Sequence, residues 1–445
     1  MKILVLSDSH GNANNITQAQ CKDALLRGQG RCLQAVQSDP ARYAPVVLWA
    51  CRHECAFDAQ CEGSRAWFVY QLVGCYEDKT PFLQATMDAL DHAKSNGGWR
   101  IFYLAELLSR FACDGESAAA DALWRKYDRL YADLSAKKRR PNRYFAELDD
   151  FGNLCVILAD SPRHMAKIAG DIGRLYRTHD FYDSRDFDWL HADKVHQYRK
   201  SLEKHAARSA DIAAFLAVGR ICRAEDEATR MLQPQRRHPQ KGIALSIWLR
   251  KKADAATVQS YADAYLAQTD PAARTEALRA FSRCPFPGNP APILVDADAP
   301  CDALREAAWE ALEHIRHPAV RDFAIARMEE NSSQALPIFI ANYQPQDEPR
   351  LCRLVSGLRV DRACTTNWHG IHLDILGMAD KGLLAPLSLL RLIYETTYCS
   401  NCREYALRQL GKRRTLTDEM LAESLWDSNS DIRAYAKRLL ARRKK

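Results

Sequence analysis

The segment 270–281, DPAARTEALRAF, contains the residue pattern that decides the fold of this chain. Arg274 is followed by Ala277 three residues later and by Phe281 seven residues later. Offsets of three and seven residues place side chains on one face of an α-helix. We therefore expect Ala277 and Phe281 to point into a core, where the small alanine lets a neighbouring helix approach closely.

The same pattern of arginine, alanine and a large apolar residue recurs along the second half of the chain. Its further copies are Arg305/Ala308/Leu312, Arg321/Ala324/Met328, Arg403/Ala406/Leu410 and Arg433/Ala436/Leu440. The spacing is 31 residues from Arg274 to Arg305 and 30 residues from Arg403 to Arg433. Fixed periods of this length mark a repeat array. We expect at least four helix pairs, and no β-sheet, between Arg274 and Leu440.

Three of these segments resemble HEAT repeats: DPAARTEALRAF, SNCREYALRQL (400–410) and SDIRAYAKRLL (430–440). The resemblance is strong over 270–440 and more diffuse over 17–266, and the whole stretch is similar to uncharacterised bacterial HEAT-like proteins. It implies stacked antiparallel helix pairs with a concave face. HEAT-like proteins include scaffolds, chromophore lyases and DNA glycosylases, so the resemblance implies no single activity.

The first half of the chain also shows helical periodicity, beginning at Thr17, with one run expected from Pro45 to about Cys55. We therefore predict an all-α fold, a superhelical solenoid of HEAT-like pairs preceded by a short unpaired apolar segment. The expected parts are residues 1–16, which form no domain, a divergent helical-repeat half at 17–233 and a HEAT-repeat half at 240–445. Pro234 and Pro239 mark a looser joint between the two halves.

The first twelve residues, MKILVLSDSHGN, resemble the opening of calcineurin-like metallophosphoesterases. In that family an Asp-x-His after the first strand ligates one ion of a two-metal centre, which implies Asp8 and His10 as ligands for manganese, iron or zinc. The family's Gly-Asn-His and Gly-His-x-His motifs occur nowhere in this sequence. Because two ligands do not form a two-metal centre, we expect residues 1–12 to carry no phosphoesterase activity.

Composition restricts the class of protein. The chain has 445 residues, of which 47% are hydrophobic and 27% charged, as in folded globular proteins. No apolar run is long enough for a membrane span, and the short apolar start lacks the features of a signal peptide. We expect a cytoplasmic protein without a membrane partner. The net charge of +7 is only mildly basic.

Basic residues gather in several short runs, and the run Lys137, Lys138, Arg139 and Arg140 is the candidate binding site. On a concave face such a run could follow a nucleic-acid backbone. Aromatic residues do not interleave with these runs, however, and most of the runs lie at helix ends, where cations favour the helix dipole. We therefore expect another protein as the partner, with nucleic acid as the alternative.

Cysteine and histidine supply the remaining candidate sites. Cys399 and Cys402 form a lone Cys-x-x-Cys, while His369 and His372 lie one helical turn apart with Asp374 nearby. A zinc site needs more ligands than either group offers alone. We expect buried structural thiols, a satisfied polar cluster around the histidines, no cofactor and no stoichiometric structural metal.

Two further groups receive the same structural interpretation. Cys51 and Cys55 are expected on one helical face, and the segment 178–196, rich in aspartate and histidine, is expected to be a polar connection. The function that fits all these observations is a non-enzymatic binding scaffold that uses the concave face of the solenoid. The alternatives are a metallophosphoesterase, on the evidence of Asp8 and His10, and a nucleic-acid-binding HEAT protein.

Overall fold

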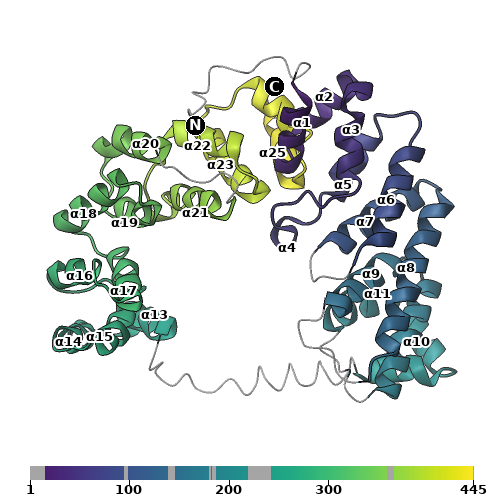
Figure 1. Cartoon of the computed structure of the whole chain (residues 1–445), viewed down its shortest axis with the longest axis horizontal. Helices are drawn as coiled ribbons and strands as arrows, with labels where there is room; N and C mark the ends of the chain where they lie inside the picture. The colour runs from purple at the N-terminus through teal and green to yellow at the C-terminus, as the bar shows by residue number, and fades with distance from the viewer. Residues whose placement is uncertain are drawn as a thin grey trace. The chain divides into compact units, whose positions relative to one another are not determined.

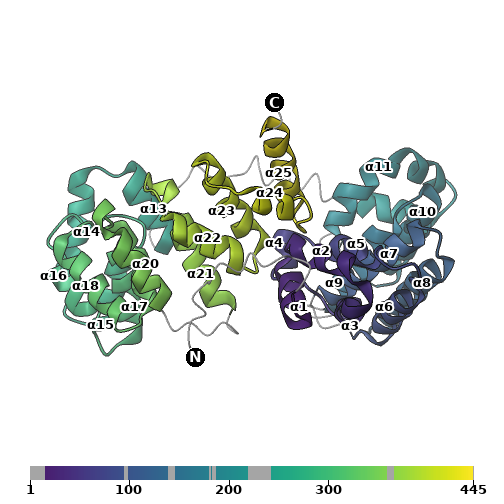
Figure 2. The same cartoon turned by 90° about the horizontal axis from the view of Figure 1, so that it is seen from above.

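The computed structural model describes residues 16–94, 99–138, 146–179, 182, 187–218, 242–357 and 365–443. Within these residues every regular element is a helix and no strand occurs, which confirms the predicted all-α class (Figures 1 and 2). None of the described helices is long and apolar enough to cross a membrane. The N-terminal segment with Asp8 and His10 lies outside the described residues.

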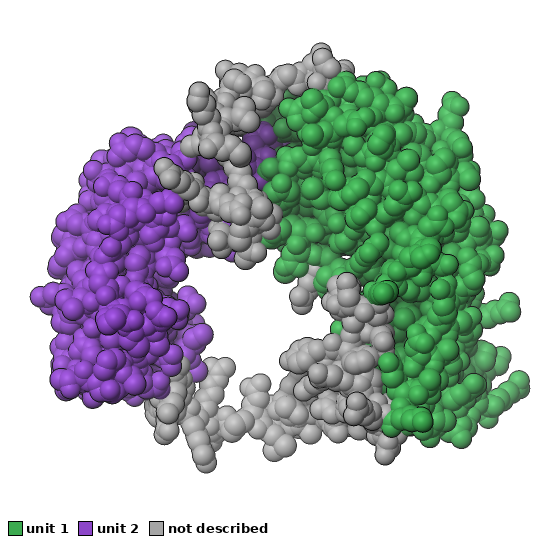
Figure 3. All heavy atoms as spheres, viewed as in Figure 1, with its two compact units in different colours: residues 1–232, 398–401, 416–445 green, residues 233–397, 402–415 purple. Residues whose placement is uncertain are grey.

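The chain divides into two compact units, coloured separately in Figure 3. Unit 1 comprises residues 1–232, 398–401 and 416–445, and unit 2 comprises residues 233–397 and 402–415. The boundary predicted between 233 and 240 falls in a stretch outside the described residues, and it stays a prediction.

Unit 1 is built from the helices of the first half of the chain together with the last two helices. These are α1 (Gln18–Arg27), α2 (Gly30–Ser38), α3 (Pro40–Ala50), α4 (Ala59–Glu62), α5 (Ala66–Val73), α6 (Thr80–His92), α7 (Arg100–Cys113), α8 (Ser117–Ser135), α9 (Ala146–Leu158), α10 (Pro162–Thr178), α11 (Asp188–Ala206), α24 (Asp418–Ser424) and α25 (Ser430–Arg443). One continuous hydrophobic core extends along the unit from Cys21 to Leu216.

Local sequence explains where α1 begins. Thr17 forms a capping box with Gln20: its hydroxyl accepts from the Gln20 N–H at 3.2 Å, and its own N–H donates to Gln20 Oε1 at 2.8 Å. This reciprocal pair satisfies N–H groups that a helix start otherwise leaves without partners. Gly28 ends the helix in the left-handed conformation, with φ of 72°. The first described helix therefore begins directly after Thr17.

The two ends of unit 1 pack against each other. The Arg31 guanidinium on α2 binds the Glu423 carboxylate on α24 through two hydrogen bonds of 2.6 and 2.8 Å. The Ser428 N–H donates to the Gly28 carbonyl oxygen at 2.8 Å. Gly30 makes the approach possible, because a Cβ at this position would lie 2.1 Å from the Glu423 carbonyl oxygen. Helices from opposite ends of the sequence thus form one packed group.

Unit 2 contains the helices of the second half of the chain up to α23. They are α13 (Gly242–Lys252), α14 (Ala255–Leu266), α15 (Pro271–Leu278), α16 (Ala291–Asp296), α17 (Asp302–Leu312), α18 (Pro318–Glu329), α19 (Leu336–Ala341), α20 (Glu348–Gly357), α21 (Thr365–Leu376), α22 (Leu387–Thr396) and α23 (Ser400–Lys412), with short 3₁₀ turns between some of them. Within each unit, consecutive helices pack in pairs, including α16 with α17, α18 with α19, α21 with α22 and α24 with α25. At least four helix pairs were expected between Arg274 and Leu440, and these four lie among the described residues of that stretch.

Four of the five alanines of the repeated pattern lie in the core, as the pattern predicts. Ala308, Ala406 and Ala436 have no exposed surface, whereas Ala277 is only half-buried. The large apolar residue that follows is buried in four of the five copies and half-buried at Leu440. The pattern therefore marks the faces of helices that pack into a core.

The repeated arginine has a structural role that the pattern alone does not explain. In three copies its Nη1 donates to the carbonyl oxygen six residues earlier, from Arg274 to Gln268 at 2.9 Å, Arg305 to Ala299 at 2.9 Å and Arg433 to Asp427 at 2.6 Å. Each of these carbonyl groups lies in the connection before the arginine's own helix. The side chain thus fastens that connection to the helix, which accounts for the conserved position of the arginine within the repeat.

Candidate anion-binding pocket and histidine–cysteine cluster

A cavity of about 450 Å³ lies in unit 2, between the start of α18, the end of α19 and the loop that follows Ala379–Lys381. Its lining residues are Arg316, His317, Pro318, Arg321, Asp322, Ala341, Asn342, Tyr343, Gln344, Lys381 and Leu383. This volume is within the range of small-ligand sites. It is large enough for one or two side chains of a bound peptide.

The lining of the cavity is predominantly cationic. Arg316, Arg321 and Lys381 contribute positive charge, while Asp322 is the one carboxylate in the lining. Arg316 and Lys381 are exposed and have no ion-pair partner among the described residues. The N-terminal end of α18, a helix of 12 residues, adds the positive end of its dipole. The cavity is therefore suited to an anionic group.

Arg321 already has a carboxylate partner and still has an N–H to donate. Its Nη2 donates to Asp347, a residue that is 3% exposed. Its Nε is buried and makes no hydrogen bond among the described residues. A buried donor without an acceptor is unfavourable, so a ligand oxygen or a water molecule that reached this nitrogen would be stabilised.

The walls of the cavity are held by Asn342. Its Oδ1 accepts the His317 N–H at 2.9 Å, and its Nδ2 donates to the carbonyl oxygens of Ile315 and Ile338 at 2.9 and 3.0 Å. The bonds with His317 and Ile315 join the α17–α18 connection to the end of α19, and the bond to Ile338 fixes Asn342 on α19 itself. Asp347 adds a second brace through its hydrogen bond from the Gln344 N–H at 2.9 Å. The basic groups are thus presented by a fixed backbone, which lowers the entropic cost of binding.

A pair of partly buried carboxyl groups lies within electrostatic range of Lys381. Burial raises the pKa of Asp374 to about 7, the nearby charge of Glu313 raises this pKa further, and Lys381 opposes the rise. Burial also raises the pKa of Glu313, against the influence of Arg283 and Lys381. A proton bound by this pair near neutral pH increases the net positive charge around Lys381.

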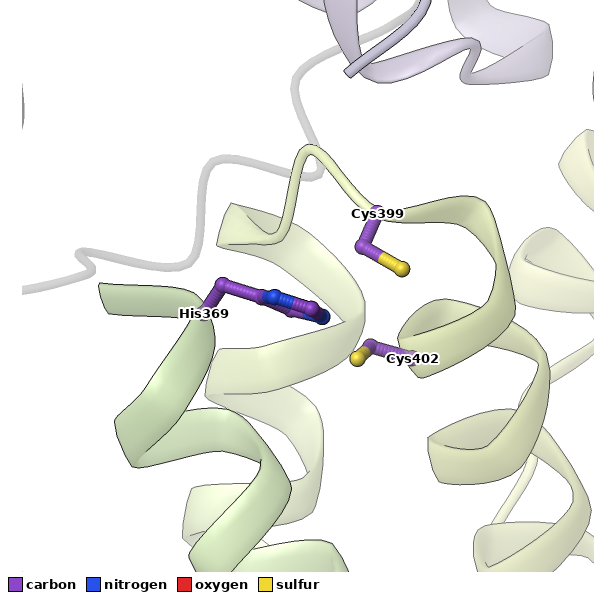
Figure 4. A group of neighbouring side chains, drawn as sticks. All are labelled: His369, Cys399 and Cys402. Carbon is purple, nitrogen blue, oxygen red and sulfur yellow. The ribbon is translucent and has the colours of Figure 1, made fainter. Parts of the chain in front are cut away.

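A second group of functional side chains lies at the start of α23 (Figure 4). His369 of α21, Cys399 and Cys402 each offer one donor atom, and these three atoms lie within 4.8 Å of one another. Both cysteines are buried and His369 is half-buried. In Figure 4 the imidazole projects from α21 toward the two cysteines at the beginning of α23. The two weak motifs of the sequence, the Cys-x-x-Cys and the histidine pair, are therefore brought together.

The polar cluster expected around the histidines is divided between different neighbours. His369 faces the cysteines, whereas buried His372 contacts the Trp368 ring edge-on, with the ring centroids 4.9 Å apart. Asp374 interacts instead with Glu313 and Lys381. Residues that are close in sequence therefore contact separate neighbours in the folded chain.

The environment of Cys51 and Cys55 agrees with a structural role but corrects their predicted placement. Helix α3 ends at Ala50 rather than near Cys55, so the two cysteines do not share a helical face. Both are buried, and burial raises the pKa of each thiol to about 12. A thiol with so high a pKa is a poor nucleophile and a poor metal ligand at neutral pH.

The other predicted site residues are not brought into a site within the described residues. Lys137 is half-buried and Lys138 is exposed after the end of α8, while Arg139 and Arg140 lie outside the described residues. Asp8 and His10 also lie outside them. Part of the segment 178–196 forms the beginning of α11 rather than a connection.

The basic cavity was missed by sequence reasoning, although one weak sign of it was present. The segment 316–321, RHPAVR, places two arginines around a His-Pro helix start, and a helix start favours anions. The contribution of Lys381 and Asn342 depends on tertiary packing alone. Comparison with known proteins adds no assignment, since no family model, curated protein or solved structure shows significant similarity to the chain.

Proposed function

We propose that the protein is a non-enzymatic binding scaffold built from HEAT-like helix pairs, and that unit 2 holds an acidic side chain of a partner protein in its basic cavity. The observation that carries the proposal is the cationic lining of this cavity. Arg316 and Lys381 are exposed without ion-pair partners, and Arg321 keeps a buried Nε without an acceptor among the described residues.

The chemistry of the cavity favours binding over catalysis. Arginine and lysine recognise carboxylates through charge-assisted hydrogen bonds, and the neighbouring start of α18 adds N–H groups and dipole charge. The lining residues include no cysteine or serine that could act as a nucleophile. His317 is held in place, because its Nδ1 accepts the Ala319 N–H at 3.2 Å.

A glutamate peptide provides a direct test. A fluorescent hexaglutamate peptide is titrated with the full-length protein at low and moderate salt, and a hexaglutamine peptide serves as the ligand control. We expect saturable binding of the acidic peptide that weakens with salt, because screening reduces the attraction between charges. The double variant Arg316→Ala/Lys381→Ala should weaken binding by roughly tenfold or more, since each charge-assisted hydrogen bond contributes ~1.5–3 kcal/mol before screening.

The matched control is Arg353→Ala, which removes an exposed arginine of α20 that does not line the cavity. This variant should bind as the wild type does. An equal loss of affinity in Arg353→Ala would show that binding depends on net charge rather than on the cavity, and would contradict the proposal.

Nucleic acid is tested in the same titration with a single-stranded thymidine oligonucleotide. Oligonucleotide binding that is tighter than peptide binding, and is lost in the double variant, would replace the protein partner by nucleic acid. The enzyme alternative depends on Asp8 and His10, and no contact of the described residues favours it.

A further inference from the structure

We infer that His369, Cys399 and Cys402 form a zinc site that has two thiolate ligands and one imidazole ligand. The inference is independent of the basic cavity and replaces the expectation that the protein binds no stoichiometric structural metal. That expectation depended on the Cys-x-x-Cys and the histidine pair being separate, whereas the structure brings their donor atoms within 4.8 Å of one another.

The arrangement is fixed by the local covalent structure that links Cys399 to Cys402 and by the packing of α23 against α21. His369 on α21 and Cys402 on α23 both belong to unit 2. Cys399 precedes Cys402 by three residues and directly adjoins the first turn of α23, so the same helix start positions both thiols. Further along this helix, Gln409 Nε2 donates to the Leu376 carbonyl oxygen at 3.2 Å, which anchors α23 to the end of α21.

The donor set matches zinc. Zinc prefers cysteine sulfur and histidine nitrogen, in four-coordinate tetrahedral geometry. Bond lengths of ~2.3 Å to sulfur and ~2.0 Å to nitrogen place neighbouring donors roughly 3.5–4 Å apart around the ion. Donor atoms that lie within 4.8 Å of one another reach this spacing through small side-chain rotations. A Cys-x-x-Cys at a helix start is a common way for two thiols to chelate one zinc ion.

The two cysteines of this group are buried, unlike those of an ordinary surface cluster. The Cys399 and Cys402 side chains are 6% and 3% exposed, so thiolates there need a cation beside them. His369 is half-buried. Among the described residues the group has three donors.

The site would join two elements that are distant in sequence. His369 lies in α21, and the cysteines lie 30 and 33 residues further along the chain, beyond α22. A single ion bound to all three side chains cross-links α21 to the start of α23. Removal of the ion should therefore loosen the beginning of α23 more than the helices of the basic cavity.

The test uses the reduced full-length protein and metal ions alone. Elemental analysis of protein purified without added chelator should find one zinc ion per chain. After zinc removal, titration with cobalt(II) should produce the thiolate-to-cobalt charge-transfer band in the ultraviolet and the intense visible bands of tetrahedral cobalt, saturating at one equivalent. Cys402→Ser and His369→Ala should each lower zinc affinity by at least tenfold.

Two further variants keep the test decisive if those substitutions disturb folding. Cys284→Ser alters another buried cysteine of unit 2 that is not part of the group, and it should retain full metal content. His369→Cys replaces the imidazole by a third thiol, so it should retain the ion and increase the charge-transfer intensity per cobalt.

Three results would overturn the inference. The first is wild-type protein that contains no zinc and shows no charge-transfer band with cobalt. The second is zinc content unchanged in both Cys402→Ser and His369→Ala, with the fold confirmed by circular dichroism. The third is a Cys399–Cys402 disulfide, found by peptide mass spectrometry under native conditions, that persists when the protein is purified with reductant and zinc.

Discussion

Replacement of Glu54 by glutamine should stabilise unit 1 at pH 8 much more than at pH 5. Glu54 lies in the connection between α3 and α4. Its Oε1 accepts the N–H groups of Cys55 and Ala56 at 2.9 and 2.8 Å, while its Oε2 is buried without a hydrogen-bond partner among the described residues. Burial raises the pKa of this carboxyl group from 4.5 to about 7, despite the two N–H groups.

The sign of the effect follows from proton linkage. Because the folded pKa lies above the unfolded value of 4.5, the folded state binds the proton more tightly, and its stability falls as the pH rises. The contribution is fully present below pH 4.5 and is lost as the pH rises through about 7. At ~1.4 kcal/mol per tenfold change in proton affinity, the ionised group costs unit 1 about 3 kcal/mol at pH 8.

Glu54→Gln reproduces the shape of the protonated carboxyl group and keeps the Oε1 acceptor, but it cannot ionise. Its stabilisation relative to wild type should therefore grow by about 2 to 3 kcal/mol between pH 5 and pH 8. The measurement is amide hydrogen exchange by mass spectrometry on peptides from α3 and α5, with variant and wild type compared at the same pH. This local measurement does not require the two units to unfold together.

The matched control is Glu77→Gln, which changes an exposed glutamate of the same unit. It should alter exchange by less than ~0.5 kcal/mol at either pH. A stabilisation by Glu54→Gln that is the same at pH 5 and pH 8 would show that Glu54 is not protonated in the folded protein, and would refute the reasoning.

Three other substitutions test the packing by urea unfolding. Gly30→Ala should destabilise unit 1 by about 1–3 kcal/mol, because its Cβ would lie 2.1 Å from the Glu423 carbonyl oxygen. The control Gly170→Ala on α10, whose Cβ would lie 3.8 Å from its nearest neighbour, should stabilise the unit by ~0.5–1 kcal/mol. A change in stability of the same sign for both variants would contradict the close approach of α2 and α24. Ala308→Glu should destabilise unit 2 by about 3 kcal/mol or more through a buried charge, while the exposed Ala272→Glu should be close to neutral. Arg274→Met should cost about 3 kcal/mol, since it leaves the buried Asp296 carboxylate without its cation and with the Tyr265 hydroxyl still bonded to it. An unchanged urea midpoint would show that this ion pair adds no stability.

Local pattern predicted the helices well, because helix periodicity and capping depend on residues a few positions apart. The capping box at Thr17 and the buried positions of Ala308 and Ala406 are both of this kind. The end of α3 was misplaced because Cys51 and Cys55 have helical spacing, although the backbone leaves the helix at Ala50. Periodicity alone does not show where a helix stops.

The candidate sites depend on contacts that no local pattern contains. The Cys-x-x-Cys was visible in the sequence, and so was His369, but their proximity arises because α23 folds back against α21. In the basic cavity, Lys381 joins Arg316 and Arg321 only through tertiary packing. In both cases the residue types could be recognised in advance, and their juxtaposition could not.

The packing of α24 against α2 has a consequence for how the protein is made. Arg31 and Glu423 are separated by 392 residues, so at ~5–20 residues per second a ribosome needs roughly 20–80 s to synthesise the chain between them. During that interval α2 already exists while the helix that covers Gly30 does not. Unit 1 is therefore completed only after Glu423 has been synthesised and has left the ribosome. Nascent chains, and chains terminated before α24, present an uncovered face of α2 to chaperones and proteases.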